Sequence, residues 1–330
     1  MSGPIPESGS RKKSQPLKSR KRISRSDVSL TLLLPFILAV SWLIPSRFWP
    51  SITRNVLVRG SAGASEDSIQ RGVRLSGLSD ELPLSGAEIS TALQVHRYVS
   101  YFQYLKDYRP GSWPCRYEIE GEDRLRSTLG QGTGVILWVA HFVFNGLPLK
   151  KALWHAGYRV HHLSRPEHGF SDTRYGIRVL NPIRSRIEMR YLAHRIIIKR
   201  GSEHIALREA HRLVSSGAIV SITAGHWEGR QIAQLPVGEA LLPISIGAPS
   251  LAHATGAPLL PVFIRMKEDR GFSVGIGKAI ACGSFATRDE AVTAALGAFS
   301  EQLKTEIRRS PDQWRGWKYL SGPSAGKRAL

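Results

Sequence analysis

The stretch GVILWVAHFVFNGLPLKKAL, residues 134–153, decides the fold. An apolar run from Val135 to Ala140 ends at His141, and the chain then continues through Asn145 and Gly146 into a second apolar segment. Such a run is typical of a strand buried on both faces that leads into a helix. Ligands of α/β proteins bind at the carboxyl ends of their strands, where His141 would lie. A histidine packed in the core is the ordinary alternative, and position alone favours it.

The chain around this stretch alternates between two kinds of segment. Strand-like segments occupy 116–121, 134–141, 158–165, 218–223 and 258–267, and helix-like segments occupy 122–132, 146–157, 203–217, 249–256 and 289–310. Several connections end in glycine, as helix ends commonly do. Alternation of this kind predicts parallel strands covered by helices. We therefore expect an α/β fold with a largely parallel central sheet flanked by helices.

The N-terminal part has a different character. Residues 29–45 contain no charge but include Pro35, and Trp42, Phe48 and Trp49 lie near the far end as interfacial anchors do. A membrane helix fits this pattern best, although a cleaved signal or a buried core helix has similar features. The expected organisation is a disordered basic tail (1–27), a membrane anchor helix (28–46), a linker (47–86), a catalytic domain (87–320) and a flexible C-terminus (321–330).

The net charge of +20 indicates an anionic partner. Eight lysines and arginines precede residue 28, but most of the excess lies outside this tail. No helix-turn-helix, zinc-finger or RNA-binding motif accompanies it, so we expect an anionic membrane surface and no nucleic acid. The two cysteines, Cys115 and Cys282, form no disulfide or metal pattern.

Two apparent motifs lack the features of a functional site. GQGTG at 130–134 precedes a strand instead of following one, so it is not a dinucleotide fingerprint. His161, His162 and His168 have no cysteine or carboxylate at ligand spacing, and a solvated surface explains them better. We therefore expect no metal and no bound cofactor.

Three downstream blocks strengthen the case for a site at His141. The first is RIIIKRG (195–201), where Lys199 and Arg200 close an apolar run and could hold a phosphate or carboxylate. The second is SITAGHWEGRQ (221–231), which leaves a strand through a polar turn that contains Glu228 and Gly229. The third is GAPSLAHATGAPLLPVFIRM (247–266), a turn and a small-residue helix before a buried strand.

In this order and spacing, the blocks resemble the lysophospholipid acyltransferase superfamily, and within it the branch of bacterial lipid A late acyltransferases. The likeness covers roughly residues 85–320 and includes YEIEGEDRLRSTLGQGTGVILWVAHF (117–142), GAIVSI (217–222), GAPSLAHATGAPLLPVF (247–263) and SPDQWRGW (310–317). The resemblance implies transfer of a fatty acyl group from an acyl carrier protein or acyl-CoA thioester to a hydroxyl of a lipid or glycolipid. It also implies a bacterial inner (plasma) membrane location with the catalytic face on the cytoplasmic side, where acyl thioesters are made.

The resemblance assigns roles to residues of this chain. His141 would be the catalytic general base. Five residues would bind substrate: Asn145, Arg165, Lys199, Arg200 and Gly229. The family pattern H-x-x-x-x-D/E requires an acid at position 146, where this chain has glycine. Glu228, on the turn after a neighbouring strand, is our candidate for the replacement. Two alternatives stay open: an inactive lipid-binding or scaffold protein, and an acyltransferase of a dedicated sugar or secondary-metabolite pathway.

Overall fold

The computed structural model describes residues 21–58, 64–110, 112–199, 201–225 and 231–322. At its centre is a seven-stranded sheet with the order β1-β9-β8-β2-β5-β3-β4. The five neighbouring strands from β8 to β4 run parallel, whereas β9 is antiparallel to β8 and pairs in parallel with β1. The expected α/β fold with a largely parallel sheet is confirmed. The strands are β1 (Tyr117–Glu120), β2 (Val135–Ala140), β3 (Val160–Ser164), β4 (His194–Ile197), β5 (Ile219–Ala224), β8 (Leu259–Met266) and β9 (Phe272–Ile276).

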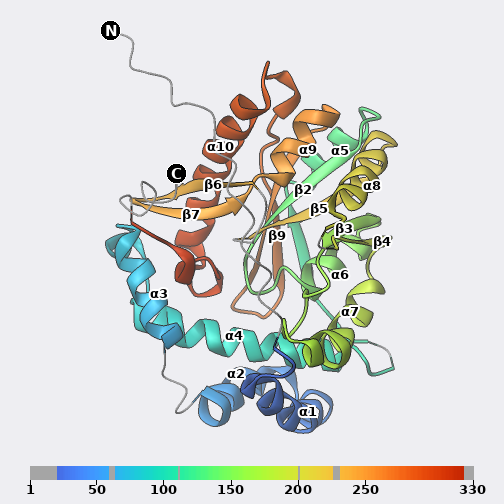
Figure 1. Ribbon diagram of the computed structural model, residues 1–330. Helices are drawn as coiled ribbons and strands as arrows, with labels where there is room; N and C mark the ends of the chain where they lie inside the picture. Colours follow the sequence, from blue (N-terminus) through green and yellow to red (C-terminus); the bar gives the residue numbers. More distant parts are fainter. Residues whose placement is uncertain (1–20, 59–63, 111, 200, 226–230, 323–330) are drawn as a thin grey trace.

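Helices cover both faces of the sheet (Figure 1). Trp138 of β2 packs against Phe299 of α10 (Arg288–Arg309), with ring centroids 4.2 Å apart. Val139, the next residue, lines a small cavity with Leu149 of α6 (Leu147–His155). Because successive side chains of a strand point to opposite faces, α10 and α6 lie on opposite sides of β2. Every residue of β2 is buried, as the apolar run predicts. Further helices are α5 (Glu122–Leu129), α7 (Asn181–Met189), α8 (Glu203–Ser215) and α9 (Gly247–Thr255).

The long helix α4 (Gly86–Lys106) lies across the carboxyl edge of the parallel strands (Figure 1). It begins with a capping box, in which the Ser85 hydroxyl accepts from the Glu88 amide and the Glu88 carboxylate accepts from the Ser85 amide. Its side chains contact segments that follow β2: His96 stacks edge-on with Phe144, and the Leu147 amide donates to the Tyr104 hydroxyl. These contacts make α4 one wall of the carboxyl edge of the sheet.

The N-terminal helices lie on the outer side of α4 (Figure 1). Helix α1 (Arg25–Leu43) begins and ends three residues before the expected anchor, and α2 (Trp49–Ile52) follows a short turn. The segment expected as a linker contains α2 and also α3 (Ala64–Leu75), whose Ile69 and Val73 are buried against the main domain. Burial of these apolar side chains is the physical reason why this segment is folded.

Two further differences from the sequence analysis concern the second half of the chain. An antiparallel hairpin, β6 (Ile232–Val237) and β7 (Ala240–Ser245), follows β5. Ser321, expected in the flexible C-terminus, pairs with Leu241 of this hairpin.

Candidate active site

His141 comes directly after β2, the central strand of the seven-stranded sheet, and is 8% exposed. Ala140 pairs with Ala224, the last residue of β5, so the segment that leaves β5 begins beside His141. Residues 226–230 of that segment, which include Glu228 and Gly229, lie outside the described residues, as does Arg200. The histidine thus occupies the edge at which ligands of α/β sheets bind, as the sequence predicts.

The C-terminal segment 310–317 fixes the backbone around His141. The Arg315 amide donates to the His141 carbonyl at 3.0 Å, and the Val143 amide donates to the Gln313 carbonyl at 2.8 Å. The Gln313 side chain also bonds to both backbone groups of Met266, at the end of β8. Segment 310–317 therefore ties the ends of β2 and β8 together and limits the movement of the histidine backbone.

A cluster of arginines lies close to this histidine backbone. Burial lowers the pKa of the Arg315 guanidinium, and the charges of Arg184 and Arg97 lower it further. Arg97 donates to the Tyr101 hydroxyl at 2.8 Å. The Arg315 cation is thus disfavoured by burial and by its two arginine neighbours, so an anionic group bound beside it would be favoured.

Position 146 is closed to any side chain. A Cβ atom built on Gly146 would overlap the Tyr104 hydroxyl and lie 2.8 Å from Arg184 Nη2 and 3.2 Å from Glu188 Oε1. The space that an acid at this position would fill is therefore occupied by side chains from α4 and α7. A carboxylate at this position, as in the pattern H-x-x-x-x-D/E, would overlap these side chains.

Glu188 is the centre of a buried network beside Gly146. Its carboxylate accepts from Tyr104 and from Arg184 Nε (2.8 Å) through Oε1, and it contacts Lys150 and His168 Nε2 (2.8 Å) through Oε2. Because a carboxylate offers about four acceptor positions, those of Glu188 are all used by these described partners. Burial alone would raise the Glu188 pKa, but the charge of Lys150 and its other partners holds this pKa well below its ordinary value.

The partners of Glu188 have shifted pKa values as well. Burial lowers the pKa of Lys150 to about 8 and that of His168 to about 4, in both cases against the attraction of the carboxylate. Burial also lowers the pKa of His162, whose Nδ1 lies 2.9 Å from the Ser221 hydroxyl. At pH 7 His168 is therefore neutral beside the charged Glu188 carboxylate, and His162 is neutral as well.

The other residues singled out from the sequence are spread along the same edge. Asn145 lines a cavity of about 10 Å³ together with Lys150 and His162. Arg165 follows β3, and its carbonyl accepts from Arg195. Lys199 is exposed after β4, three strands from β2, so the two strand axes are about 14 Å apart. The described structure thus brings Asn145 close to the histidine segment and leaves Lys199 at the far edge.

Sequence reasoning assigned His162 and His168 to a solvated surface, which is wrong, because His162 is buried and His168 pairs with buried Glu188. It did not single out the other members of the Glu188 network or Arg315. Tyr104 lies on α4 and Glu188 lies on α7, so neither residue follows a strand of the central sheet directly. No sequence motif includes either of them. The signal that was available is the lone acid within RSRIEMR (184–190), where the other charged residues are arginines. A single carboxylate among arginines at helical spacing predicts a local ion pair.

Metal and thiol chemistry have little support in the described residues. No group of three or more His, Cys, Asp or Glu side chains among them could hold a metal ion. Burial raises the pKa of Cys115 to about 12 and that of Cys282 to about 11, so neither thiol is ionised at neutral pH.

Comparisons with known proteins leave the family open. No family model matches the chain, and no curated protein matches it in sequence. A solved structure that it resembles is the 1-acyl-sn-glycerophosphate (LPA) acyltransferase PlsC from Thermotoga maritima. The match has 13% sequence identity and a TM-score of 0.39, and it covers 88% of this chain and 99% of that one.

Proposed function

We propose that the protein is a membrane-associated O-acyltransferase in which His141 is the general base. The observation that supports this most is the position of His141: it lies at the carboxyl end of β2, the central strand of the sheet, with 8% of its surface exposed and its backbone tied to Arg315. An imidazole at this edge can accept a proton, and the arginine cluster favours an anionic group on the substrate. The resemblance in sequence supplies the reaction class.

In the proposed reaction, neutral His141 takes the proton of the acceptor hydroxyl as the oxygen attacks the carbonyl carbon of the thioester. The tetrahedral intermediate then expels the thiolate, which receives the proton from the imidazolium. The products are the acyl ester and a free thiol, and the histidine returns to its neutral form. General-base help of this kind is worth about 10²–10⁴-fold. The donor would be acyl carrier protein or acyl-CoA, and the acceptor a lipid or glycolipid.

The carboxylate that orients His141 must come from a position other than 146. Glu188 is nearest to that position, but its acceptor sites are used by Tyr104, Arg184, Lys150 and His168. Glu188 therefore supports the turn after the histidine and is a positioning residue. Glu228 remains our candidate for the acid, because β5 is hydrogen-bonded to β2 and the chain leaves β5 at the level of His141.

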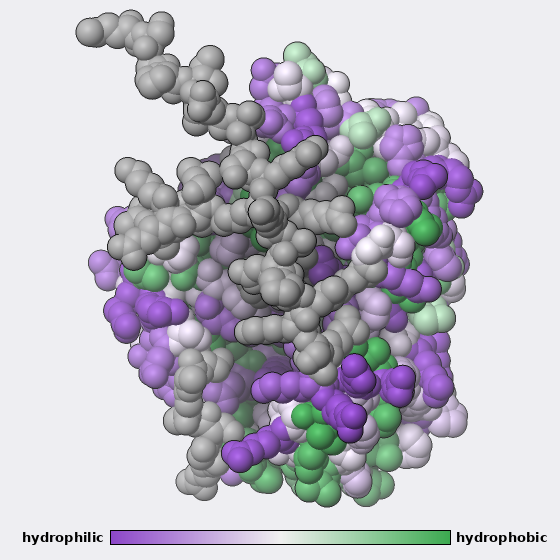
Figure 2. All heavy atoms as spheres, in the orientation of Figure 1, coloured by the Kyte–Doolittle hydropathy of each residue, from purple (hydrophilic) through white to green (hydrophobic). Residues whose placement is uncertain are grey.

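Membrane association is the second part of the proposal. Within the described residues, α1 is the one helix long and apolar enough to cross a membrane. One face of α1 packs on the domain: Trp42 Nε1 donates to the Leu105 carbonyl, and buried Asp27 accepts from Thr173. The outer face exposes Val28, Leu32 and Phe36 at helical spacing. Hydrophobic side chains gather at this end of the molecule in Figure 2.

A helix with one face packed along the domain and the other face apolar suits the interface plane of a membrane better than a free-standing span. This arrangement would place α4 and the carboxyl edge of the sheet towards the lipid, where an acceptor hydroxyl is found. The cytoplasmic face of a bacterial inner membrane is the proposed location, because acyl thioesters are made in the cytosol.

The test uses the full chain in membranes with labelled acyl carrier protein or acyl-CoA. Wild type should transfer label to lipid, and His141→Ala should lose most of this activity, by the 10²–10⁴-fold or so that a general base contributes. Lipid mass spectrometry of cells with and without the protein would then identify the acceptor. Equal labelling by wild type and His141→Ala would contradict the enzymatic proposal and favour a lipid-binding protein.

A further inference from the structure

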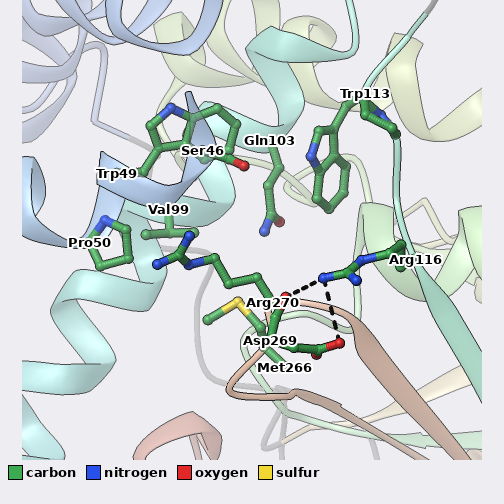
Figure 3. A pocket seen from close by; sticks show the side chains of 11 residues that line it. Ser46, Trp49, Pro50, Val99, Gln103, Trp113, Arg116, Met266, Asp269 and Arg270 are labelled. Atoms are coloured by element: carbon green, nitrogen blue, oxygen red, sulfur yellow. Dashed lines mark hydrogen bonds and ion pairs between the residues drawn. The ribbon is translucent and has the colours of Figure 1, made fainter. Parts of the chain in front are cut away.

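A second site lies outside the arginine cluster and the Glu188 network. A cavity of about 180 Å³ opens between α4, the segment 46–50, the segment 113–116 and the β8–β9 turn (Figure 3). It is somewhat larger than the engineered apolar cavity of about 150 Å³ that is known to hold benzene. Unlike that cavity, it has both aromatic and charged walls, so it has the size and chemistry for a small polar group.

The floor of the cavity contains an unsatisfied amide. Gln103 of α4 is 2% exposed, and its Oε1 atom is buried with no hydrogen-bond partner among the described residues. Figure 3 shows the amide pointing into the cavity. Burial of an amide oxygen without a donor is costly, and native proteins rarely leave one in this state. A ligand that brings an O–H or N–H group to this oxygen would remove the cost.

The rim of the cavity contains a strained arginine. Arg270 has a φ of 64°, in the left-handed region that favours glycine, although Gly271 follows it immediately in the same turn. Its side chain reaches across the cavity towards Val99 and Pro50 (Figure 3). No ion pair of Arg270 occurs among the described residues, whereas neighbouring Asp269 pairs with Arg116 at 3.5 Å. Backbone strain of this kind is commonly retained for function.

Tryptophan side chains line the cavity, and the apolar helix α1 ends close to it in the sequence. Trp49 and Trp113 line it, and both residues are buried. Ser46 on its wall comes three residues after α1 ends at Leu43, which is 81% exposed. Tryptophan with arginine beside an exposed apolar helix end is typical of the level at which lipid headgroups lie.

We propose that this cavity binds the headgroup of an anionic phospholipid that carries a hydroxyl, of the phosphatidylglycerol class. Arg270 would pair with the phosphodiester, because a guanidinium forms charge-assisted bonds with phosphate oxygens. The headgroup hydroxyl would donate to Gln103 Oε1. The inference rests on the membrane association in the proposed function, but it does not depend on acyl transfer.

The test compares two short-chain lipids of equal charge, phosphatidylglycerol and phosphatidylmethanol, of which the second lacks the hydroxyl. Calorimetric titration of the full-length protein in mild detergent should show about fivefold tighter binding of phosphatidylglycerol, as expected for one neutral hydrogen bond. Gln103→Leu should abolish this preference while keeping affinity for both lipids. Equal binding of the two lipids by wild type would overturn the proposal.

Arg270→Gly tests the charge without a risk of misfolding, because glycine adopts the left-handed backbone more readily. This variant should melt at the same temperature as wild type or higher, and should bind both lipids about tenfold more weakly, as for loss of a charge-assisted pair. Arg208→Gln, at an exposed position of α8, is the matched control for net charge and should bind as wild type does. Unchanged lipid affinity of Arg270→Gly would overturn the proposal.

Two further measurements complete the test. The first distinguishes a lipid headgroup from a free phosphate, and the second distinguishes the lipid-binding proposal from the acyltransferase proposal. Glycerol phosphate and inorganic phosphate should bind far more weakly than the lipid, and equal binding would overturn the lipid assignment. His141→Ala should bind phosphatidylglycerol as wild type does, whether or not it transfers acyl groups. Loss of lipid binding in Arg270→Gly can thus be recorded even if the acyltransferase proposal fails.

Discussion

The hydroxyl of Tyr104 occupies the space that a side chain at position 146 would need, and Gly146 is the residue that permits this. The same hydroxyl accepts from the Leu147 amide and donates to Glu188. Helix α4 is thereby joined to the first turn of α6, directly after the histidine segment. The absence of an acid at 146 is a consequence of this packing, since a carboxylate from another helix, α7, lies there instead.

Gly146→Asp should therefore not restore a catalytic dyad. The new side chain overlaps Tyr104 and adds a buried charge, so we expect a loss of stability of about 1–3 kcal/mol from overpacking alone and no gain in turnover. Chemical denaturation and acyl transfer measure the two effects. Gly146→Ala with and without Tyr104→Phe forms a matched cycle: the alanine should cost less when the hydroxyl is absent. Higher turnover of Gly146→Asp would contradict this account.

Glu188→Gln should chiefly lower the free energy of unfolding. It leaves buried Lys150 and partly buried Arg184 without their counter-ion, and removal of one partner of a buried ion pair costs about 3–5 kcal/mol. Urea denaturation should show this loss, whereas Glu209→Gln, which removes a half-exposed ion pair with His194 on the surface of α8, should change little. A stable Glu188→Gln protein would show that the network does not hold this turn.

How far the sequence predicts this site depends on the element concerned. The apolar run before His141 specifies β2, and strand–helix alternation specifies the sheet, because burial on both faces imposes a strong pattern. Lysine is ordinarily a surface residue, yet Lys150 and Lys151 are 5% and 1% exposed. Their burial depends on Glu188 and Asp107, which lie in distant segments and pair with them only in the folded chain. Long-range ion pairs of this kind leave no local periodicity, so they cannot be predicted from one sequence.

Stability should fall on mild acidification. The folded pKa of His168 is about 4 and its ordinary value is 6.5, so the unfolded chain binds a proton between these values that the folded chain does not. Stability is then present above pH 6.5 and is lost as the pH falls towards 4, by up to about 3 kcal/mol. His162, whose pKa is lowered as well, adds to the loss in the same range. Urea denaturation at pH 7.0, 6.0 and 5.0 or so measures the slope. His168→Gln should make it shallower, and an unchanged slope would contradict the assignment.

Arg315→Leu should separate substrate binding from stability. The guanidinium is disfavoured by burial and by Arg184 and Arg97, so its removal relieves repulsion and should leave the melting temperature unchanged or raise it. If the cluster holds an anionic group of the substrate, KM should rise about tenfold, the usual scale for one charge-assisted contact, with a smaller change in kcat. Arg315→Lys should retain part of the affinity. Unchanged KM together with lower stability would mean that Arg315 is structural.

Glu228→Gln tests whether Glu228 supplies the carboxylate that is missing at position 146. If its carboxylate orients His141 and stabilises the imidazolium, turnover should fall about as deeply as in His141→Ala, within the 10²–10⁴-fold or so expected of general-base catalysis. KM and the melting temperature should change little, in contrast to Glu188→Gln, because Glu228 would act on the charge that develops during the reaction. Glu228→Asp is the conservative control and should recover part of the rate. If Glu228→Gln retains wild-type turnover, the orienting acid is another residue, or His141 works without one.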